Sequence, residues 1–468
     1  MRILLINPPK SSRESYGVYS TAAPVLPPLG LCYLASTLLE DRHKIKIVDA
    51  VAGKLTFKEI KDMITEYAPK IVGLTSTTIS YKSACKVIDI TKEINDNIVT
   101  ILGGAHVSAN PYETMKECKN LDITVVNEGE HTIKELVRNI EQNGNMTLIK
   151  GIYYRENGDI IKNSPRALEN NIDIFPFPNR ELLNDLRLYS HVPMRGPRKL
   201  TTTMITSRGC PYHCSFCQQS IFGRTWRGHS PDYVVGEIKT LIEKYKVQFI
   251  SIEDDNFAFD RNRVIKICYK MINDRFRVEW GCSININDLD GELLKIMRYA
   301  GCKNIYIGIE SASSRMLRLY QKNERLDKLI NTINLIKKVG LNVYGAFILG
   351  APTESKKELG ETIKFAITLP LDGVSFSLYV PYPNTKLRYL AFRSGIVSKN
   401  WDDYSAHPNN PSFINNGFTA KKILKIQKRA YLRFYFRCGY IVRHLKFIFR
   451  TNFIFKAFNV LIKLSFLK

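Results

Sequence analysis

Residues 208–217 read Arg208-Gly209-Cys210-Pro211-Tyr212-His213-Cys214-Ser215-Phe216-Cys217, directly after a strand-like run at 203–206. Its three thiols follow one another at spacings of four and three positions. On one loop they can therefore converge on one metal centre. Iron–sulfur clusters are held by cysteine thiolates, usually four of them. No fourth cysteine lies nearby. A cluster bound here would therefore leave one iron free to bind another molecule.

Two other interpretations of this loop remain open. A structural zinc ion takes four protein ligands in a closed tetrahedron. His213 would have to supply the fourth ligand from inside the loop, which would strain it. A disulfide between two of the thiols is the other alternative. We favour the iron–sulfur interpretation because it needs no fourth local ligand.

The sequence around the loop alternates between short apolar runs and amphipathic segments. The predicted strands are residues 203–206, 249–252, 278–282, 304–309, 343–349 and 373–379, with helices such as 231–245 and 327–339 between them. Six strand–helix units in series favour a curved sheet over a flat one. We therefore predict a partial (β/α)6 TIM-type barrel for residues 200–400, with the cysteine loop after its first strand.

Residues 1–145 show a similar alternation. Apolar runs at 3–6, 45–48, 71–74, 98–102 and 123–126 are separated by amphipathic segments such as 29–39 and 81–94. Strands that are apolar throughout are typical of a parallel sheet covered on both faces. The fold class is therefore α/β, and this domain is predicted to be a doubly wound, Rossmann-like sheet that binds a ligand beyond the carboxyl ends of its strands.

The residues that follow these five strands are small or polar. They are Asn7-Pro8-Pro9, Asp49-Ala50, Thr75-Ser76-Thr77-Thr78, Gly103-Gly104-Ala105-His106 and Asn127-Glu128-Gly129-Glu130. Glycine and small hydroxyls allow a flat or phosphate-bearing ligand to approach the backbone closely. Ordinary turn chemistry explains any one of these exits equally well. The five together favour a ligand site.

Residues 146–199 are predicted to connect the two domains. Residues 151–161 are typical of a β-hairpin with Asn157-Gly158 as its turn, and a proline-rich stretch follows at 175–178.

The chain has a formal net charge of +24, and residues 401–468 supply about half of this excess. No acidic residue follows Asp403, and residues 421–468 contain thirteen Lys or Arg mixed with aromatic and aliphatic side chains. Such a basic amphipathic helical tail favours contact with an anionic membrane surface. A helical cap on the barrel is the second interpretation, and binding of single-stranded RNA is the third.

The remaining cysteines are scattered, so we expect reduced thiols that behave as small buried apolar residues. They are Cys32, Cys85, Cys118, Cys268, Cys282, Cys302 and Cys438. Residue Met1 leads directly into a strand-like run, and no stretch reaches the roughly 20 apolar residues of a spanning helix. We expect a cytoplasmic protein whose tail contacts the inner face of the membrane peripherally.

The Cys-x3-Cys-x2-Cys spacing after the first barrel strand resembles the radical S-adenosylmethionine (radical SAM) superfamily. The resemblance implies a 4Fe-4S cluster ligated by Cys210, Cys214 and Cys217, whose open iron binds S-adenosylmethionine. It also implies reductive cleavage of that cofactor and hydrogen abstraction by the resulting 5′-deoxyadenosyl radical. Phe216, the aromatic residue before the last cysteine, belongs to the same motif.

Further stretches resemble the superfamily's weaker strand motifs. The segment at 251–257 is similar to a variant of the motif that contacts the methionine amino group, 308–311 to the ribose motif, and 347–354 to the adenine motif. The residues that this resemblance assigns to S-adenosylmethionine, besides Phe216, are Glu253, Asp254, Glu310, Ser311 and Gly350.

Residues 1–145 resemble the cobalamin-binding domain fused to one branch of this superfamily. The Asp-x-His-x-x-Gly loop that supplies an axial histidine in cobalamin-dependent mutases is absent, and His43 lacks the rest of that pattern. The residues that the resemblance assigns to cobalamin are Pro28, Leu29, Gly30, Ser76, Thr77, Gly103, Gly104, His106, Glu128 and Gly129.

The resemblance implies a cobalamin-dependent radical SAM enzyme that C-methylates an unactivated carbon of a lipophilic or natural-product substrate. One alternative is a cobalamin-dependent oxidative cyclase or another radical reaction without methylation. A non-catalytic cobalamin or redox sensor is the alternative of a different class. The expected partners are a small-molecule or lipid substrate and an external electron donor of the flavodoxin or ferredoxin type, without nucleic acid.

Overall fold

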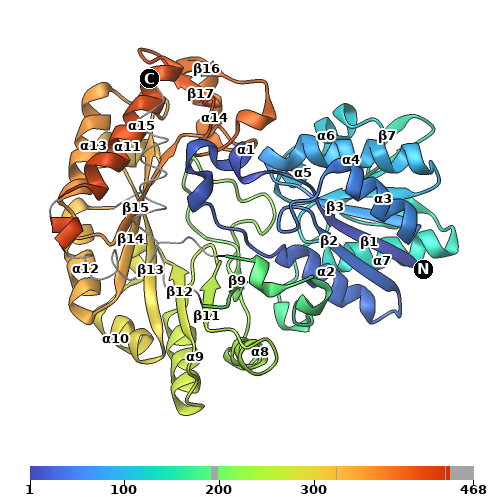
Figure 1. The fold of residues 1–468 in the computed structure, drawn as a ribbon, viewed down its shortest axis with the longest axis horizontal. Helices are drawn as coiled ribbons and strands as arrows, with labels where there is room; N and C mark the ends of the chain where they lie inside the picture. Colours follow the sequence, from blue (N-terminus) through green and yellow to red (C-terminus); the bar gives the residue numbers. More distant parts are fainter. Residues whose placement is uncertain (191–198, 323, 438, 443–468) are drawn as a thin grey trace. The chain divides into compact units, whose positions relative to one another are not determined.

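Two units with interleaved segments make up the chain (Figure 1). The first comprises Met1–Ser11, Val25–Tyr189 and Gln218–Arg227, and the second comprises Ser12–Pro24, Ser190–Cys217 and Gly228–Lys468. The computed structural model describes residues 1–190, 199–322, 324–437 and 439–442. The short segments 12–24 and 218–227 each belong to the unit that does not contain their chain neighbours, an exchange that no sequence pattern indicates.

A seven-stranded sheet with the order β2-β1-β3-β4-β5-β6-β7 forms the centre of the first unit. Its five parallel strands are β1 (Arg2–Asn7), β2 (Lys44–Asp49), β3 (Ile71–Thr75), β4 (Val99–Gly103) and β5 (Ile123–Val125). They coincide with the five predicted apolar runs. This order is that of a doubly wound sheet whose switch point lies between β1 and β3. The predicted fold class of the first domain is confirmed.

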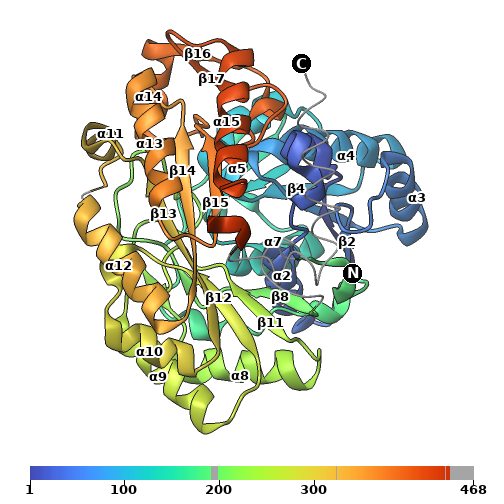
Figure 2. The same cartoon turned by 60° about the vertical axis from the view of Figure 1, so that its left-hand side comes forward.

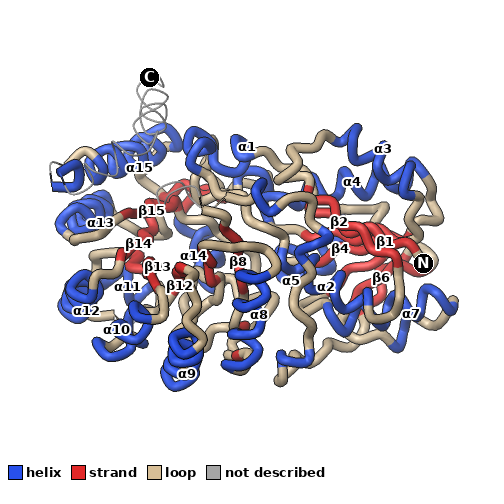
Figure 3. Tube along the Cα trace, turned by 60° about the horizontal axis from the view of Figure 1, so that its bottom comes forward, coloured by secondary structure: helices blue, strands red, loops and turns tan. Residues whose placement is uncertain are grey.

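Helices cover both faces of this sheet, as Figure 3 shows. On one face α2 (Leu29–Leu39) packs beside α7 (Glu130–Gln142), and on the other α3 (Phe57–Tyr67) packs beside α4 (Tyr81–Ile94). Short helices α5 (Ala105–Ala109) and α6 (Pro111–Glu117) follow β4. Because side chains alternate between the faces of a strand, Ile3 and Leu5 join the buried cluster under α2 and α7.

The predicted hairpin is confirmed and extends the same sheet. Strands β6 (Ile152–Glu156) and β7 (Asp159–Lys162) pair antiparallel, and β6 pairs antiparallel with β5. The turn residues Asn157 and Gly158 have φ values of 50° and 91°. Positive φ at both central residues is what a two-residue hairpin turn requires, and asparagine followed by glycine tolerates it.

The second unit contains six parallel strands in chain order, β8-β11-β12-β13-β14-β15. They are β8 (Thr201–Met204), β11 (Phe249–Ile252), β12 (Glu279–Ser283), β13 (Cys302–Glu310), β14 (Asn342–Leu349) and β15 (Gly373–Leu378). The intervening helices are α8 (Pro231–Glu243), α9 (Arg261–Asn273), α10 (Gly291–Tyr299), α11 (Ser314–Leu319), α12 (Leu326–Val339) and α13 (Lys356–Thr368), and α14 (Lys386–Ser394) follows β15. The predicted partial (β/α)6 barrel is confirmed, with β8 and β15 as its two edges.

The outer edge of β15 is covered by α15 (Ala420–Tyr435), as Figure 2 shows. The Tyr431 hydroxyl accepts a hydrogen bond from the Phe376 backbone N–H at 2.9 Å, and Gln427 Nε2 donates to the Phe376 carbonyl at 2.7 Å. The Tyr435 hydroxyl lies 3.3 Å from the Val374 backbone nitrogen. Unpaired strand edges are prone to pairing with other chains, so these side chains complete the edge of the sheet.

This packing corrects part of the prediction for the tail. Helix α15 does not present its apolar face to a membrane, because Ile423, Ala430 and Phe434 are buried in the core of the second unit. The helical cap was the second interpretation of this sequence, and a basic amphipathic pattern does not distinguish the two. The rest of the predicted membrane segment, residues 443–468, lies outside the described residues. Within the described part of the chain, no helix is both long and apolar enough to span a bilayer.

Five of the scattered cysteines are buried as predicted, namely Cys32, Cys118, Cys268, Cys282 and Cys302. Cys85 is half-buried, and Cys438 lies outside the described residues.

We expect Tyr431→Phe to lower the free energy of unfolding by about 1–2 kcal/mol, because a buried backbone N–H loses its acceptor. His407 Nε2, which lies 2.7 Å from the same hydroxyl, loses its partner as well. Urea unfolding measures the change. Tyr389→Phe is the control, since Tyr389 is 70% exposed. Equal stabilities of the two variants would show that the hydroxyl does not support the sheet edge.

Candidate functional site

A buried carboxylate, that of Asp254, fixes the backbone just before the cysteine loop. Asp254, which follows β11, is 3% exposed. It accepts hydrogen bonds from the Thr206 backbone N–H at 2.5 Å, the Thr206 hydroxyl at 2.6 Å and the Ser207 hydroxyl at 2.6 Å. Burial raises its pKa, while the Arg263 guanidinium and these donors act in the opposite direction. Asp254 was predicted to contact S-adenosylmethionine, but here it fixes the exit of β8.

A second anchor holds the middle of the loop at Ser215. Its backbone N–H donates to the Tyr320 carbonyl at 2.9 Å and its hydroxyl to the Leu319 carbonyl at 2.8 Å. Its own carbonyl accepts a hydrogen bond from the Leu387 N–H at 2.9 Å. The end of α11 and the start of α14 therefore fix the backbone next to Cys214.

The three thiols lie close enough to influence one another electrostatically. Burial raises the pKa of Cys214 to about 11 and that of Cys217 to about 12, and it also raises the pKa of Cys210. The charges of Cys214 and Cys210 add to the shift at Cys217. Cys217 is nevertheless exposed. Ligation requires thiolates, so metal binding at this loop must displace three protons.

Three cysteine thiols on one loop are the donor type that iron–sulfur clusters take. Among the residues that the structure describes, no three His, Cys, Asp or Glu side chains lie close enough together to hold one metal ion. A four-iron cube places each thiolate on a different iron, so its ligands need not converge on one atom. A tetrahedral zinc site does need convergence.

A buried lysine lies between two carboxylates close to the loop. Lys322 Nζ is 3.4 Å from Glu310 Oε1 and 3.2 Å from Glu324 Oε1, and it contacts the Gly308 carbonyl. Burial opposes the charge on Lys322, but the two carboxylates together raise its pKa. Lys322 in turn acts to lower the pKa of Cys214. A Cβ atom at Gly308 would meet the Glu310 carboxylate, so glycine leaves room for this side chain.

Sequence reasoning found Glu310 in this group but missed Lys322 and Glu324. Twelve residues separate Glu310 from Lys322, and the intervening helix α11 gives no spacing signal. Burial raises the pKa of both carboxyl groups, and the charge of Lys322 acts against this shift.

The turn after β14 is held by another buried carboxyl group. Glu354 Oε2 accepts hydrogen bonds from the Gly350 N–H at 2.6 Å and the Ala351 N–H at 3.2 Å. Glu354 Oε1 is buried and has no hydrogen-bond partner among the residues that the structure describes, and burial raises the pKa of this group to about 8. Gly350 adopts a φ of 73°, which favours glycine. Gly350 therefore shapes a turn that a protonated carboxyl group stabilises.

The other residues predicted for S-adenosylmethionine have different surroundings. Ser311 is fully buried, and its hydroxyl lies 3.0 Å from that of Thr362. Phe216 is partly buried, with its ring edge-to-face on Tyr320 at 5.4 Å between centroids. Glu253 is exposed and accepts a hydrogen bond from the Ser251 hydroxyl at 2.6 Å. Phe216 and Glu253 remain accessible, whereas Ser311 supports the start of α11.

Asp255 is a carboxylate that the prediction did not select. It is exposed, although partial burial raises its pKa. Its negative charge helps to raise the pKa of Cys210 and that of Cys217. Neighbouring residues of an extended segment point to opposite sides, so Asp254 points into the fold when Asp255 does not. That alternation is the signal that would have separated the two.

The carboxyl ends of the first unit's strands form a glycine-rich edge. Gly104 has a φ of 101°, and a Cβ atom there would lie 2.5 Å from the Ser76 carbonyl oxygen. Ser76 is buried and holds Gly103 through its backbone N–H, at 2.9 Å from the Gly103 carbonyl. Thr77 and Gly30 are exposed. This edge at the switch point allows close approach of a ligand to the backbone and therefore fits cobalamin.

Some residues predicted for cobalamin are engaged within the protein. The His106 ring is 1% exposed and stacks on Tyr81 at 4.2 Å between centroids. Leu29 is buried, while Pro28 and Gly129 are partly exposed. Glu128 forms a buried ion pair with Arg227, whose Nη1 lies 2.9 and 2.8 Å from its two carboxylate oxygens. The sequence gives no signal for this pair, because its partners are 99 residues apart.

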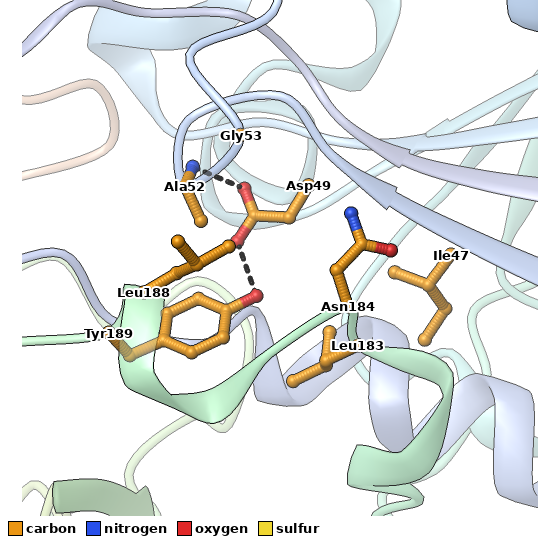
Figure 4. Close-up of a pocket in the computed structure, with 8 residues that line it drawn as sticks. All are labelled: Ile47, Asp49, Ala52, Gly53, Leu183, Asn184, Leu188 and Tyr189. Carbon is orange, nitrogen blue, oxygen red and sulfur yellow. Dashed lines mark hydrogen bonds between the residues drawn. The ribbon is translucent and has the colours of Figure 1, made fainter. Parts of the chain in front are cut away.

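A small pocket lies beside the end of β2 in the first unit (Figure 4). Asp49 accepts hydrogen bonds there from Asn7 Nδ2 at 2.8 Å and from the Tyr189 hydroxyl at 3.0 Å. The Val51 and Ala52 backbone N–H groups add two more. With four donors, this carboxylate closes the β2 exit and is not free for a ligand.

Two domain families match the chain. The radical SAM superfamily matches residues 204–366 and the B12 binding domain matches residues 17–137. An uncharacterized methyltransferase of Pyrococcus horikoshii is 37% identical over 448 residues, which cover 95% of each chain. The anaerobic magnesium-protoporphyrin IX monomethyl ester cyclase of Rubrivivax gelatinosus is 30% identical, covering 83% of this chain and 69% of that one.

A solved structure shares the fold. The radical S-adenosylmethionine methyltransferase TsrM of Kitasatospora setae, with cobalamin and a [4Fe-4S] cluster bound, matches with a TM-score of 0.67 and 17% identity. The match covers 82% of this chain and 73% of that chain.

We expect the ionisation of Glu354 to destabilise the protein as the pH rises. The folded-state pKa of about 8 exceeds the ordinary value of 4.5, so the contribution of this group is complete below about pH 4.5. Between these values the unfolded state releases a proton that the folded state keeps. The free energy of unfolding then falls by at most about 1.4 kcal/mol per pH unit.

Glu354→Gln removes this dependence, so its stability relative to the wild type rises up to about pH 8 and then levels off. Urea unfolding across this pH range measures the difference. Glu361→Gln, on the exposed side of α13, is the control. Parallel pH profiles for the wild type and Glu354→Gln would contradict the assignment.

Proposed function

The chain belongs to the cobalamin-dependent branch of the radical SAM superfamily, and from this premise we propose that it C-methylates an unactivated carbon of a small molecule. One observation carries the proposal. A loop with three thiols, and with no fourth cysteine near it in the sequence, is fixed at the end of the first barrel strand, in the same chain as a B12-binding sheet. The relative named as a methyltransferase, which aligns over 95% of both chains, supports this choice of reaction.

Cys210, Cys214 and Cys217 would hold the 4Fe-4S cluster. Their loop is fixed on both sides by protein contacts, those of Asp254 and those of Ser215. When bound, the cluster with S-adenosylmethionine and the cobalamin supply one-electron chemistry at an unactivated carbon and a transferable methyl group. The chain must position these groups and exclude water.

Lys322 is suited to bind the carboxylate of S-adenosylmethionine. It is a buried cation whose charge acts to lower the pKa of Cys214. Glu310 and Glu253 are candidates for the amino group of the cofactor, since one contacts Lys322 and the other is exposed beyond β11. Phe216 and Tyr320 cover one side of the loop with aromatic surface. Asp254, Ser311 and Gly350 have hydrogen-bond partners within the fold, and their contacts with S-adenosylmethionine remain predictions.

On the first unit, Gly30, Thr77, Gly103 and Gly104 would form the backbone surface against cobalamin. Pro28, Leu29, Ser76 and Gly129 would shape that surface from behind or beside it. His106 is stacked within the fold, which agrees with the absence of the sequence motif for an axial histidine.

Oxidative cyclisation is the second candidate function. The relative named as a cyclase is 30% identical across 83% of this chain, which favours this reaction over other radical chemistry without methylation. Transfer of the methyl group from isotopically labelled S-adenosylmethionine to a product distinguishes the two reactions.

We expect Cys214→Ser to abolish both cluster binding and cofactor cleavage. Anaerobically reconstituted wild type should contain about four irons per chain and produce 5′-deoxyadenosine with a chemical reductant, whereas the variant should do neither. Iron analysis and chromatography measure the two properties. Cys85→Ser is the matched control, because Cys85 is a half-buried thiol of the other unit. An active Cys214→Ser protein would exclude this loop as the cluster site.

Replacing Lys322 should weaken the binding of S-adenosylmethionine without emptying the cluster. Losing one charged contact costs about 2–3 kcal/mol, so Lys322→Gln should raise the dissociation constant at least about 30-fold. Glu324→Gln introduced together with it removes one of the two carboxylates that lose their partner, which limits the cost to folding. Lys322→Arg should restore part of the affinity. Unchanged binding in all three proteins would exclude Lys322 from the cofactor site.

A further inference from the structure

The start of α14 is bonded directly to the cysteine loop. The Leu387 N–H donates to the Ser215 carbonyl, and Lys386 Nζ lies 3.3 Å from Gln321 Oε1, just beyond α11. Ser215 stands between Cys214 and Cys217 in the sequence. The backbone of α14 is therefore linked to the thiol loop by one hydrogen bond.

The outward side of α14 exposes large apolar side chains. Tyr389 is 70% exposed, Phe392 is 58% exposed and Ile396, just after the helix, is 69% exposed. The opposite side is buried through Leu387 and Ala391. Residues three and four apart lie on one side of a helix, so Tyr389 and Phe392 form one stripe. Adjacent exposed aromatic rings are a common feature of protein-binding surfaces.

Part of this stripe is held rigidly before any partner binds. The Arg388 guanidinium lies 5.1 Å from the centroid of the Phe392 ring. It also lies 5.6 Å from the Trp401 ring and 5.7 Å from the Tyr404 ring. A side chain that is already ordered loses little entropy on binding, so Phe392 can act as an anchor.

The surface around the stripe is positively charged. Helix α14 carries three basic residues and no acidic one. The exposed cations are Lys386 and Arg393 on α14, Lys399 after it, and Arg318 on α11. The first carboxylates beyond α14 are those of Asp402 and Asp403, and Asp403 accepts hydrogen bonds from Ser398 and Asn410. An acidic partner would complement this surface in sign.

We propose that α14, together with Arg318, is the docking surface for an acidic, low-potential electron-transfer protein of the flavodoxin or ferredoxin class. The proposal rests on the proposed function, in which the cluster must be reduced. The carrier is oxidised by one electron and the cluster is reduced by one electron, and no bond forms or breaks. The hydrogen bond from Leu387 to Ser215 links this surface to the backbone between two cluster ligands.

A lipid bilayer and a second copy of this chain fit the surface of α14 less well. A bilayer would need a longer apolar face than one nine-residue helix whose inner side is packed on the barrel. A second copy of this chain would place like charges against each other, because the formal net charge is +24.

The test compares two double variants of matched design. Lys386→Glu/Tyr389→Ser changes the proposed surface. Lys266→Glu/Tyr269→Ser changes an exposed lysine and a 52% exposed tyrosine with the same spacing on α9. A recombinant acidic flavodoxin is the probe. The readouts are its dissociation constant for the full-length protein with and without cluster, and the stopped-flow rate of cluster reduction by flavodoxin or by dithionite.

We expect the α14 variant to weaken flavodoxin binding, and to slow subsaturating reduction by flavodoxin, by about ten-fold or more. Reduction by dithionite should be unchanged. The α9 control should stay within about two-fold of the wild type for each readout. Raising the salt concentration should weaken wild-type binding more than binding of the α14 variant.

Equal effects of the two variants would overturn the proposal, as would slower dithionite reduction in the α14 variant. A change in self-association, or loss of binding to anionic vesicles, in that variant alone would assign the surface to another occupant and also overturn it. Failure of the proposed function would appear separately, as a wild type that forms no 5′-deoxyadenosine with dithionite. The flavodoxin dissociation constants would still decide the docking proposal.

Discussion

The geometry of the thiol loop depends on burying the Asp254 carboxylate under the exit of β8. A buried carboxylate is costly unless donors surround it, and here Thr206 and Ser207 supply three. Arg263 adds a positive charge and donates to the Thr206 and His229 carbonyls. Contacts within the protein therefore fix the backbone that leads into Cys210. Ser215 performs the same role from the other side, so the loop can present its thiols without a fourth protein ligand.

The residues that follow the strands differ in chemistry between the two units. In the first unit, glycine and small hydroxyls at the switch point leave the backbone accessible, and Gly104 is required because a Cβ atom would collide with Ser76. In the second unit, carboxyl groups at the exits of β11, β13 and β14, namely Asp254, Glu310 and Glu354, are buried and bonded. Segment 218–227 directly follows Cys217 but belongs to the first unit, where the Arg227–Glu128 ion pair holds it.

The sequence was sufficient to predict the architecture because its signals are local. Apolar runs located the strands to within two or three residues, Asn157-Gly158 located the hairpin, and cysteine spacing located the loop. The roles of individual charged residues depend on tertiary contacts and were not predictable. Asp254 and Asp255 are neighbours with opposite surroundings, and Lys322 meets Glu310 only through the fold of α11. Glu128 resembles a ligand-site residue in sequence, yet its partner Arg227 is distant in the chain. Helices that lie on a membrane and helices that pack on a barrel edge can have the same basic amphipathic sequence. This explains why membrane contact was wrongly expected for α15.

The central claim is that Cys210, Cys214 and Cys217 hold a four-iron cluster with one iron open to S-adenosylmethionine. Electron paramagnetic resonance of the anaerobically reconstituted, reduced protein tests it directly, with and without that cofactor. The account predicts the signal of a reduced 4Fe-4S cluster whose g-values shift when S-adenosylmethionine is added. A protein that contains only zinc, or a cluster signal that the cofactor leaves unchanged, would contradict it.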